Sequence, residues 1–227
     1  MNTLLVTILP SLCILAYFIY SDKFPEPKSE ILKVFALGVL ITIPAFFLNT
    51  FLMTFFRGSS MSQGLINSFF SAAPVEEGLK LSILYFFVYK RKEFNEPIDG
   101  IVYGICASLG FATLENIYYV YMLADHFRSS SIDLAILRAF SAIPAHAVFG
   151  MFMGYFFTKY SFVKKEDSLL FAFLVPFTLH GCYNLFMYSN FLAGMLLVII
   201  SWIVSLKLFF SLKLNQKKKK HEDEKKI

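Results

Sequence analysis

The strongest constraint on this chain is its succession of long apolar segments, which short charged connectors separate. Hydrophobic residues make up 57% of the 227 positions, whereas soluble domains are typically about half apolar. An apolar run of about 18 or more residues is long enough to cross a bilayer as a helix. The sequence therefore predicts an all-α, polytopic membrane helix bundle with about seven transmembrane helices, at residues 3–20, 31–56, 65–89, 98–123, 136–158, 168–188 and 191–213.

Lysine and arginine are unequally distributed over the connectors, and this predicts the orientation of the bundle. The first, third and fifth connectors and residues 213–227 together hold sixteen of these residues, whereas the other three connectors hold three, counting Arg138. Because basic connectors stay in the cytoplasm, we expect the N-terminus outside and the C-terminus in the cytoplasm. Residues 1–213 would form one transmembrane domain, and residues 214–227 a basic cytoplasmic tail whose low-complexity composition is typical of disorder.

Three ionisable residues interrupt the third apolar segment, within the stretch "VEEGLK": Glu76, Glu77 and Lys80. Each such group costs about 2.5–3.5 kcal/mol at the centre of a membrane helix, so these side chains must face the protein interior or a wet cavity. Helical spacing lets Lys80 reach both acids. Two coupled carboxylates that share one cation retain one negative charge or one shared proton. This pattern favours general acid–base chemistry, and the alternative is a buried charge cluster that only holds helices together.

Polar residues also occur in the next three segments. They are Glu115 and Asn116 in the fourth, His146 in the fifth, and His180 and Asn184, four residues apart, in the sixth. With the predicted topology, Glu76, Glu115 and the two histidines all lie about 12–17 Å below the outer surface, from a rise of about 1.5 Å per residue. This shared depth favours one common site over independent packing residues.

Small residues and prolines accompany these groups. Small side chains recur every four residues along two segments, a spacing that lets membrane helices approach closely, and prolines that precede the ionisable residues would open the backbone ladder to water. The stripes are Gly100, Gly104, Ser108 and Ala112, then His146, Gly150 and Gly154, and the prolines are Pro74, Pro144 and Pro176.

The ordered set Glu76-Glu77-x-x-Lys80, Phe111-x-x-x-Glu115-Asn116, His146 and His180 resembles the PrsW-type intramembrane proteases, relatives of the CAAX prenyl endopeptidases and bacteriocin-immunity proteins. The resemblance runs from about residue 70 to 190, and it implies that the transmembrane domain at residues 1–213 is a protease of the bacterial plasma membrane, in a multi-pass protein. It implies a glutamate-type, metal-independent endopeptidase without a cofactor. Lys80 and Glu115 stand where the CAAX branch usually has arginine and histidine, which favours the PrsW branch.

The resemblance also implies a substrate. PrsW-like members make the first, extracytoplasmic cut in an anti-sigma factor with one membrane span, and a second protease then frees the sigma factor. The expected partners are therefore a single-span membrane protein, most plausibly an anti-sigma factor, and membrane lipid. Nucleic acid is not expected, because the basic residues lie in connectors and the tail without interleaved aromatic residues.

Peptide hydrolysis needs a base for water, a donor to the oxyanion and an acid for the leaving amine. Glu76 or Glu77 would be the base, and His180 would polarise the water or protonate the amine. Asn184 or His146 would stabilise the oxyanion. Lys80 would hold the two acids, Glu115 would orient a histidine, and Asn116 would support the site. The sequence contains neither a GxSxG nor an HExxH motif.

Two other interpretations use the same residues. Two carboxylates and two histidines would also suit zinc or iron, which would make the chain a metal-dependent, CAAX-like membrane peptidase. A proton-coupled carrier, or a scaffold with a buried charge relay, would also keep ionisable groups inside membrane helices.

Overall fold

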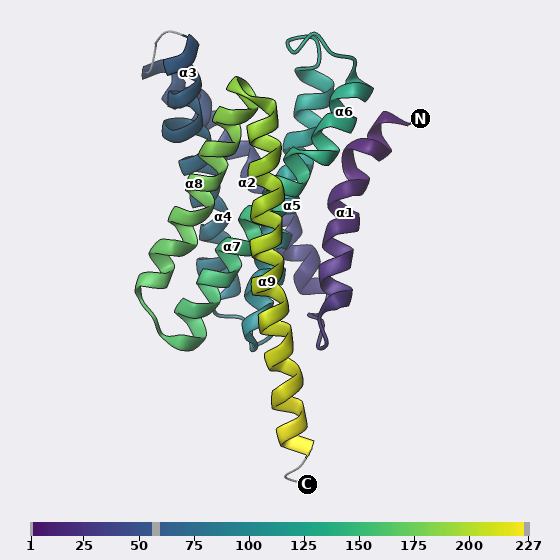
Figure 1. Ribbon diagram of the computed structural model, residues 1–227, viewed down its shortest axis with the longest axis vertical. Helices are drawn as coiled ribbons and strands as arrows, with labels where there is room; N and C mark the ends of the chain where they lie inside the picture. The colour runs from purple at the N-terminus through teal and green to yellow at the C-terminus, as the bar shows by residue number, and fades with distance from the viewer. Residues whose placement is uncertain (1, 56–59, 225–227) are drawn as a thin grey trace.

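The computed structural model describes residues 2–55 and 60–224, with side chains described for residues 2–55 and 62–216. Every regular element within these residues is a helix, and the helices form one bundle (Figure 1). In chain order they are α1 (Thr3–Ser21), α2 (Lys28–Phe55), α3 (Ser60–Ile66), η1 (Asn67–Ala72), α4 (Ala73–Ile83), η2 (Leu84–Val88), α5 (Pro97–Met122), α6 (Ser131–Phe140), α7 (Ala142–Val163), α8 (Asp167–Ser189) and α9 (Phe191–Glu224).

Six helical stretches in the described residues are long and apolar enough to cross a membrane, which confirms the predicted all-α membrane bundle. They are α1, α2, α5, α6 with α7 as one stretch, α8, and α9 as far as Gln216. The predicted segment 65–89 is also helical, but it is divided into α3, η1, α4 and η2. Both η elements are π-helical, and Pro74 lies in the first turn of α4. Because proline has no backbone N–H, it removes one bond of the regular helical ladder.

The predicted segment 136–158 begins earlier than expected and contains a break. Helices α6 and α7 meet at Ser141, whose φ and ψ are −119° and −71°. Pro144 follows three residues later and cannot donate to the carbonyl of Phe140, the last residue of α6. The break therefore lies three residues before the proline in the first turn of α7, and five residues before His146.

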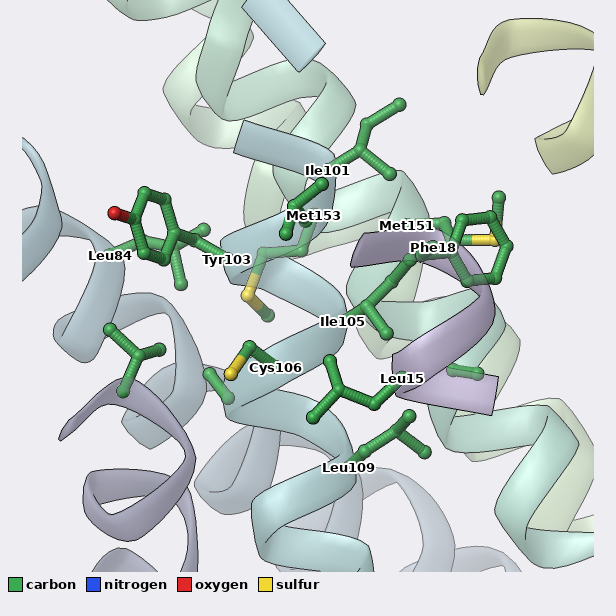
Figure 2. Packing of buried hydrophobic residues seen from close by; sticks show 14 of the residues in the cluster. Leu15, Phe18, Leu84, Ile101, Tyr103, Ile105, Cys106, Leu109, Met151 and Met153 are labelled. Atoms are coloured by element: carbon green, nitrogen blue, oxygen red, sulfur yellow. The ribbon is translucent and has the colours of Figure 1, made fainter. Parts of the chain in front are cut away.

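Helix α5 occupies the centre of the bundle. In an apolar stretch of 18 residues, 89% of its residues are buried, against 22% in α1. Its large side chains pack with Leu15 and Phe18 of α1 and with Met151 and Met153 of α7 (Figure 2). The centre of the molecule is therefore an apolar interface between helices, and the polar cluster lies beside it.

The two predicted stripes of small residues face each other between α5 and α7. A Cβ added at Gly104 would meet the carbonyl oxygen of Gly150, and one added at Gly100 would meet that of Gly154. Ser108 donates a hydrogen bond to the carbonyl oxygen of His146 at 2.6 Å. Close backbone approach thus fixes the height of α7, and with it His146, against α5.

The two chain ends lie at opposite ends of the bundle (Figure 1). Helix α9 runs past the bundle to Glu224, so the prediction of disorder for residues 214–227 is wrong as far as Glu224, and residues 225–227 lie outside the described part. Lysine, glutamine and glutamate are good helix formers, and here they extend a helix that the apolar segment has already nucleated.

A second polar cluster lies where the connector between α1 and α2 meets α5 and α9. Tyr103 donates to Glu26 at 2.6 Å, and Gln216 donates to Asp22 at 3.0 Å and to Glu96 at 2.5 Å. Burial raises the pKa of Glu26, while its hydrogen bond from Tyr103 acts in the opposite direction. These bonds tie α9 to the connectors at the end of the bundle where the chain ends.

Candidate active site

The polar residues singled out by the sequence come from four helices. They are Glu76, Glu77 and Lys80 on α4, Glu115 and Asn116 on α5, His146 on α7, and His180 and Asn184 on α8. Glu77 and Lys80 are completely buried, and both histidines are 2% exposed. The structure brings all of them except Asn116 and Asn184 into one connected cluster.

Glu77 lies at the centre of the cluster. Its Oε1 accepts from Lys80 Nζ at 2.8 Å and lies 2.7 Å from His180 Nδ1. Because a carboxylate accepts hydrogen bonds, the ring nitrogen Nδ1 of His180 must carry a proton to bond with it. In the neutral imidazole, the other ring nitrogen, Nε2, then carries a lone pair. Glu77 therefore orients His180, as a carboxylate orients the histidine of a hydrolase dyad.

Lys80 links this pair to His146. Lys80 Nζ lies 3.0 Å from His146 Nδ1 and 4.4 Å from the centre of the Phe111 ring. A lysine ammonium has donors only, so Nδ1 must accept. The proton of neutral His146 then sits on Nε2, which lies 3.1 Å from Glu115 Oε2. Both ring nitrogens of His146 therefore have partners, and Glu115 orients this histidine rather than His180.

Glu76 is placed differently from its neighbour. Its Oε1 accepts from Asn49 Nδ2 on α2 at 3.4 Å. Its Oε2 is buried without a hydrogen-bond partner among the described residues, 3.9 Å from His180 Nε2 and 4.0 Å from Lys80 Nζ. Glu77 also has one unpartnered oxygen, but only Glu76 of the two lines the cavity described below.

Two members of this region were not predicted as site residues. Arg138, which the charge count assigns to a connector, lies on α6 and donates to Glu115 Oε2 at 2.9 Å and to Asn116 Oδ1 at 2.7 Å. Asn49, the other addition, was read as part of an ordinary apolar span. Each is a polar residue inside an apolar run, which was the signal available for both.

Asn116 connects neighbouring helices. Its Nδ2 donates to the carbonyl oxygen of Thr7 on α1 at 2.8 Å, while its Oδ1 accepts from Arg138. Its side chain is completely buried. Asn116 therefore joins α1, α5 and α6 behind the cluster and lies outside the wall of the cavity.

A large cavity of about 1220 Å³ adjoins the cluster. Glu76, Glu115, Arg138 and His146 line its polar part, and Asn184 lines it without any hydrogen-bond partner in the described residues. Most of the remaining wall is aromatic and aliphatic, from α2, α5, α6 and α8. Small-molecule pockets occupy about 300–1,000 Å³, so this cavity has room for a longer, extended segment.

The cluster also holds a set of donors of the kind that binds metal. One ligand atom each from Glu76, His146 and His180 lie within 4.8 Å of one another. Two imidazoles and one carboxylate are a common catalytic zinc set. In the described geometry, however, the two nitrogens of His146 contact Lys80 and Glu115, and the Lys80 ammonium lies 4.0 Å from the Glu76 oxygen. Among these three residues, only Glu76 and His180 have a ligand atom without such a contact, so a metal ion at this site would require His146 to release Lys80 or Glu115.

The carboxylates of the cluster outnumber its lysine and arginine side chains. Those of Glu76, Glu77 and Glu115 face Lys80 and Arg138. Glu77 and Glu115 have short ion pairs, at 2.8 and 2.9 Å, whereas Glu76 lies 4.0 Å from Lys80 Nζ. Glu76, which lines the cavity, is therefore the carboxylate with the weakest cationic pairing of the three.

Comparison with known proteins identifies the family of the chain. Residues 26–209 match the family described as "PrsW family intramembrane metalloprotease". The chain is 42% identical to Protease PrsW of Geobacillus kaustophilus over 77% of this chain and 75% of that protein. It is 36% identical to Protease PrsW of Oceanobacillus iheyensis over 88% and 90% of the two chains, and 36% identical to that of Bacillus subtilis over 86% and 88%. No solved structure matches the chain. With its apolar helices and its buried acid–histidine cluster, this multi-pass bacterial membrane protein belongs to the PrsW family of intramembrane proteases.

Proposed function

We propose that this chain hydrolyses a single-span membrane protein near its extracytoplasmic side, with Glu76 as the general base for water. The observation that carries the proposal is the placement of Glu76, which lines the cavity and whose buried Oε2 has no hydrogen-bond partner among the described residues, 3.9 Å from His180 Nε2. A base must be able to accept a proton within reach of the substrate, and Glu77 is already committed to Lys80 and His180.

The reaction follows from these placements. Glu76 takes one proton from water as the water oxygen bonds to the carbonyl carbon of the substrate. His180, oriented by Glu77, accepts a hydrogen bond from the other water hydrogen. The free amide of Asn184 donates to the oxyanion that forms. When the C–N bond breaks, the proton held by Glu76 passes to the leaving amine, which restores the carboxylate.

The proposed mechanism is glutamate-type and metal-independent. Lys80 supplies the positive charge beside the two acids, at 2.8 and 4.0 Å. His146, the third member of the possible metal set, serves instead as a bridge between Lys80 and Glu115. The family is described as one of metalloproteases, and chelation of the purified protein decides between the two mechanisms.

The proposed substrate class is an anti-sigma factor with one membrane span, cut as the first step of regulated intramembrane proteolysis. The family resemblance supports this substrate. The cavity supports a polypeptide ligand, because it is larger than a small-molecule pocket and its walls are mainly apolar.

The test compares the membrane proteins that accumulate in three strains: wild type, Glu76→Gln and Glu166→Gln. Glu166 is exposed in the connector before α8, so its variant controls for the loss of one carboxylate. We expect the substrate to persist at full length in the Glu76→Gln strain alone. Equal processing in all three strains would contradict the proposed role of Glu76.

A further inference from the structure

We propose that Arg138 is a positioning residue of this protease, which holds Glu115 and thereby keeps His146 in the tautomer that pairs with Lys80. The inference rests on the proposed function, because its readout is peptide hydrolysis. Arg138 comes from α6, a helix that contributes no other member of the hydrogen-bonded cluster.

The guanidinium group of Arg138 is held on three sides by one helix. It donates to Glu115 at 2.9 Å and to Asn116 at 2.7 Å, and its central carbon lies 3.9 Å from the centre of the Tyr119 ring. The side chain is only 12% exposed. An arginine that acts only as a topology signal is expected to contact water. The guanidinium group of Arg138 is instead largely covered by partners whose arrangement suits its planar set of donors.

The position of Arg138 determines the direction of the hydrogen bonds behind it. Arginine has donors only, so Glu115 Oε2 must accept from it, and the same oxygen accepts from His146 Nε2. With its proton on Nε2, His146 presents a lone pair on Nδ1 to Lys80.

The chain of contacts then continues to the reacting groups. Lys80 donates to Glu77, and Glu77 accepts from His180. Arg138 is therefore the outer end of one continuous series that joins α6, α5, α7, α4 and α8. Without it, Glu115 would lose a cationic partner and His146 the fixed acceptor that determines its tautomer.

The first experiment measures steady-state cleavage of a single-span substrate by the purified full-length protein in detergent. For Arg138→Gln we expect kcat to fall about 10- to 100-fold, by analogy with residues that orient the histidine ligands of metal sites, with KM unchanged. Arg128→Gln, an exposed arginine in the connector before α6, is the matched control and should keep wild-type constants. A raised KM with normal kcat would instead make Arg138 a substrate anchor and overturn the proposal.

The second experiment asks whether Arg138 acts through Glu115. In a double-mutant cycle, Arg138→Gln should lower kcat only slightly when Glu115→Gln is already present, because the two residues belong to one series. If the fold reductions in kcat of the two single variants multiply in the double variant, the residues act independently, which would contradict the proposal. If Arg138→Gln does not fold, Arg138→Lys carries the test: lysine can pair with Glu115 but cannot also span Asn116, so kcat should be intermediate, and a wild-type kcat would overturn the inference.

The outcomes separate this inference from the proposed function. If Glu76→Gln is inactive while Arg138→Gln keeps full kcat, only the role of Arg138 fails. If Glu76→Gln cleaves like wild type, the proposed function fails, whatever Arg138 does.

Discussion

At the scale of single residues, two adjacent glutamates occupy different chemical positions. Glu77 is completely buried and holds both Lys80 and His180, whereas Glu76 lines the cavity and has one oxygen without a hydrogen-bond partner among the described residues. Removing one partner of a buried ion pair leaves the other charge uncompensated, which costs about 3–5 kcal/mol. The same substitution at the two positions should therefore affect stability differently.

We predict that Glu77→Gln and His180→Ala each abolish proteolysis while the protein is still expressed and inserted. Loss of a base or its oriented partner should reduce the rate by about 10²-fold or more. Glu77→Gln should also lower the melting temperature in detergent, because Lys80 loses its closest anion, whereas Glu76→Gln should melt near wild type. Near-normal cleavage by either variant would remove that residue from the mechanism, and equal melting of the two glutamine variants would contradict their different placement.

Metal dependence is a second residue-scale prediction. We expect purified protein to keep its activity after exhaustive chelation, because His146 has no lone pair free for a metal when Lys80 and Glu115 hold its ring nitrogens. Activity that is lost on chelation and returns with one specific metal would instead place Glu76, His146 and His180 in a ligand shell.

Most residues of the buried cluster could be predicted from the sequence, because ionisable groups in apolar membrane segments must face the protein interior or a wet cavity. The sequence could not show that Glu115 pairs with His146 and Glu77 with His180, since both pairings depend on how helices rotate in the bundle. Arg138 escaped prediction for another reason. It lies close to a connector, where an arginine is usually a topology signal.

At the scale of elements, the close approach of α5 and α7 sets the geometry of the site. We predict that Gly104→Ala destabilises the protein, because the added Cβ would meet the carbonyl oxygen of Gly150 and force the two helices apart. Gly78→Ala is the matched control, since its Cβ would find its nearest neighbour, a Phe173 ring carbon, at an ordinary 3.8 Å. The melting temperature in detergent should fall for Gly104→Ala only. Equal melting temperatures for the two variants would contradict the packing described.

The helices themselves were predicted well and their interruptions poorly. Hydropathy marks where the chain is apolar, but it does not register the π turns before Glu76 or the break at Ser141. These irregularities depend on prolines and on packing against neighbouring helices. The extension of α9 to Glu224 was missed because composition alone does not show that a helix already begun can continue.

At the scale of the whole molecule, the cavity reaches one end of the bundle. Its wall includes Phe127 of the connector between α5 and α6, and Tyr188 and Phe191 where α8 meets α9. Those connectors lie at the end where the chain begins, while α9 leaves from the opposite end (Figure 1). Under the predicted orientation, with the lysine-rich end in the cytoplasm, the cavity opens toward the outside.

We therefore predict that the scissile bond lies outside or just within the outer leaflet. A substrate helix resists attack until its backbone bonds open, and its extracytoplasmic end is the part nearest the cavity mouth. N- and C-terminal tags on a single-span substrate, with mass spectrometry of the fragments, will locate the cut. A cytoplasmic cut would contradict the orientation or the reach of the cavity, and reporter fusions to the connectors would show which.

The series of contacts from α4 to α8 also has a consequence for how the protein is made. A ribosome releases Glu76, Glu77 and Lys80 well before Glu115, His146 and His180. Until those later helices arrive, α4 must hold three ionisable groups with only one another and Asn49 of α2 as partners, at a cost of about 2.5–3.5 kcal/mol each in lipid. We expect the newly made α4 to stay beside the insertion machinery until its partners follow. The last of them, His180, is on α8, so under the proposed mechanism a nascent chain cannot cut its neighbours before its own synthesis is nearly complete.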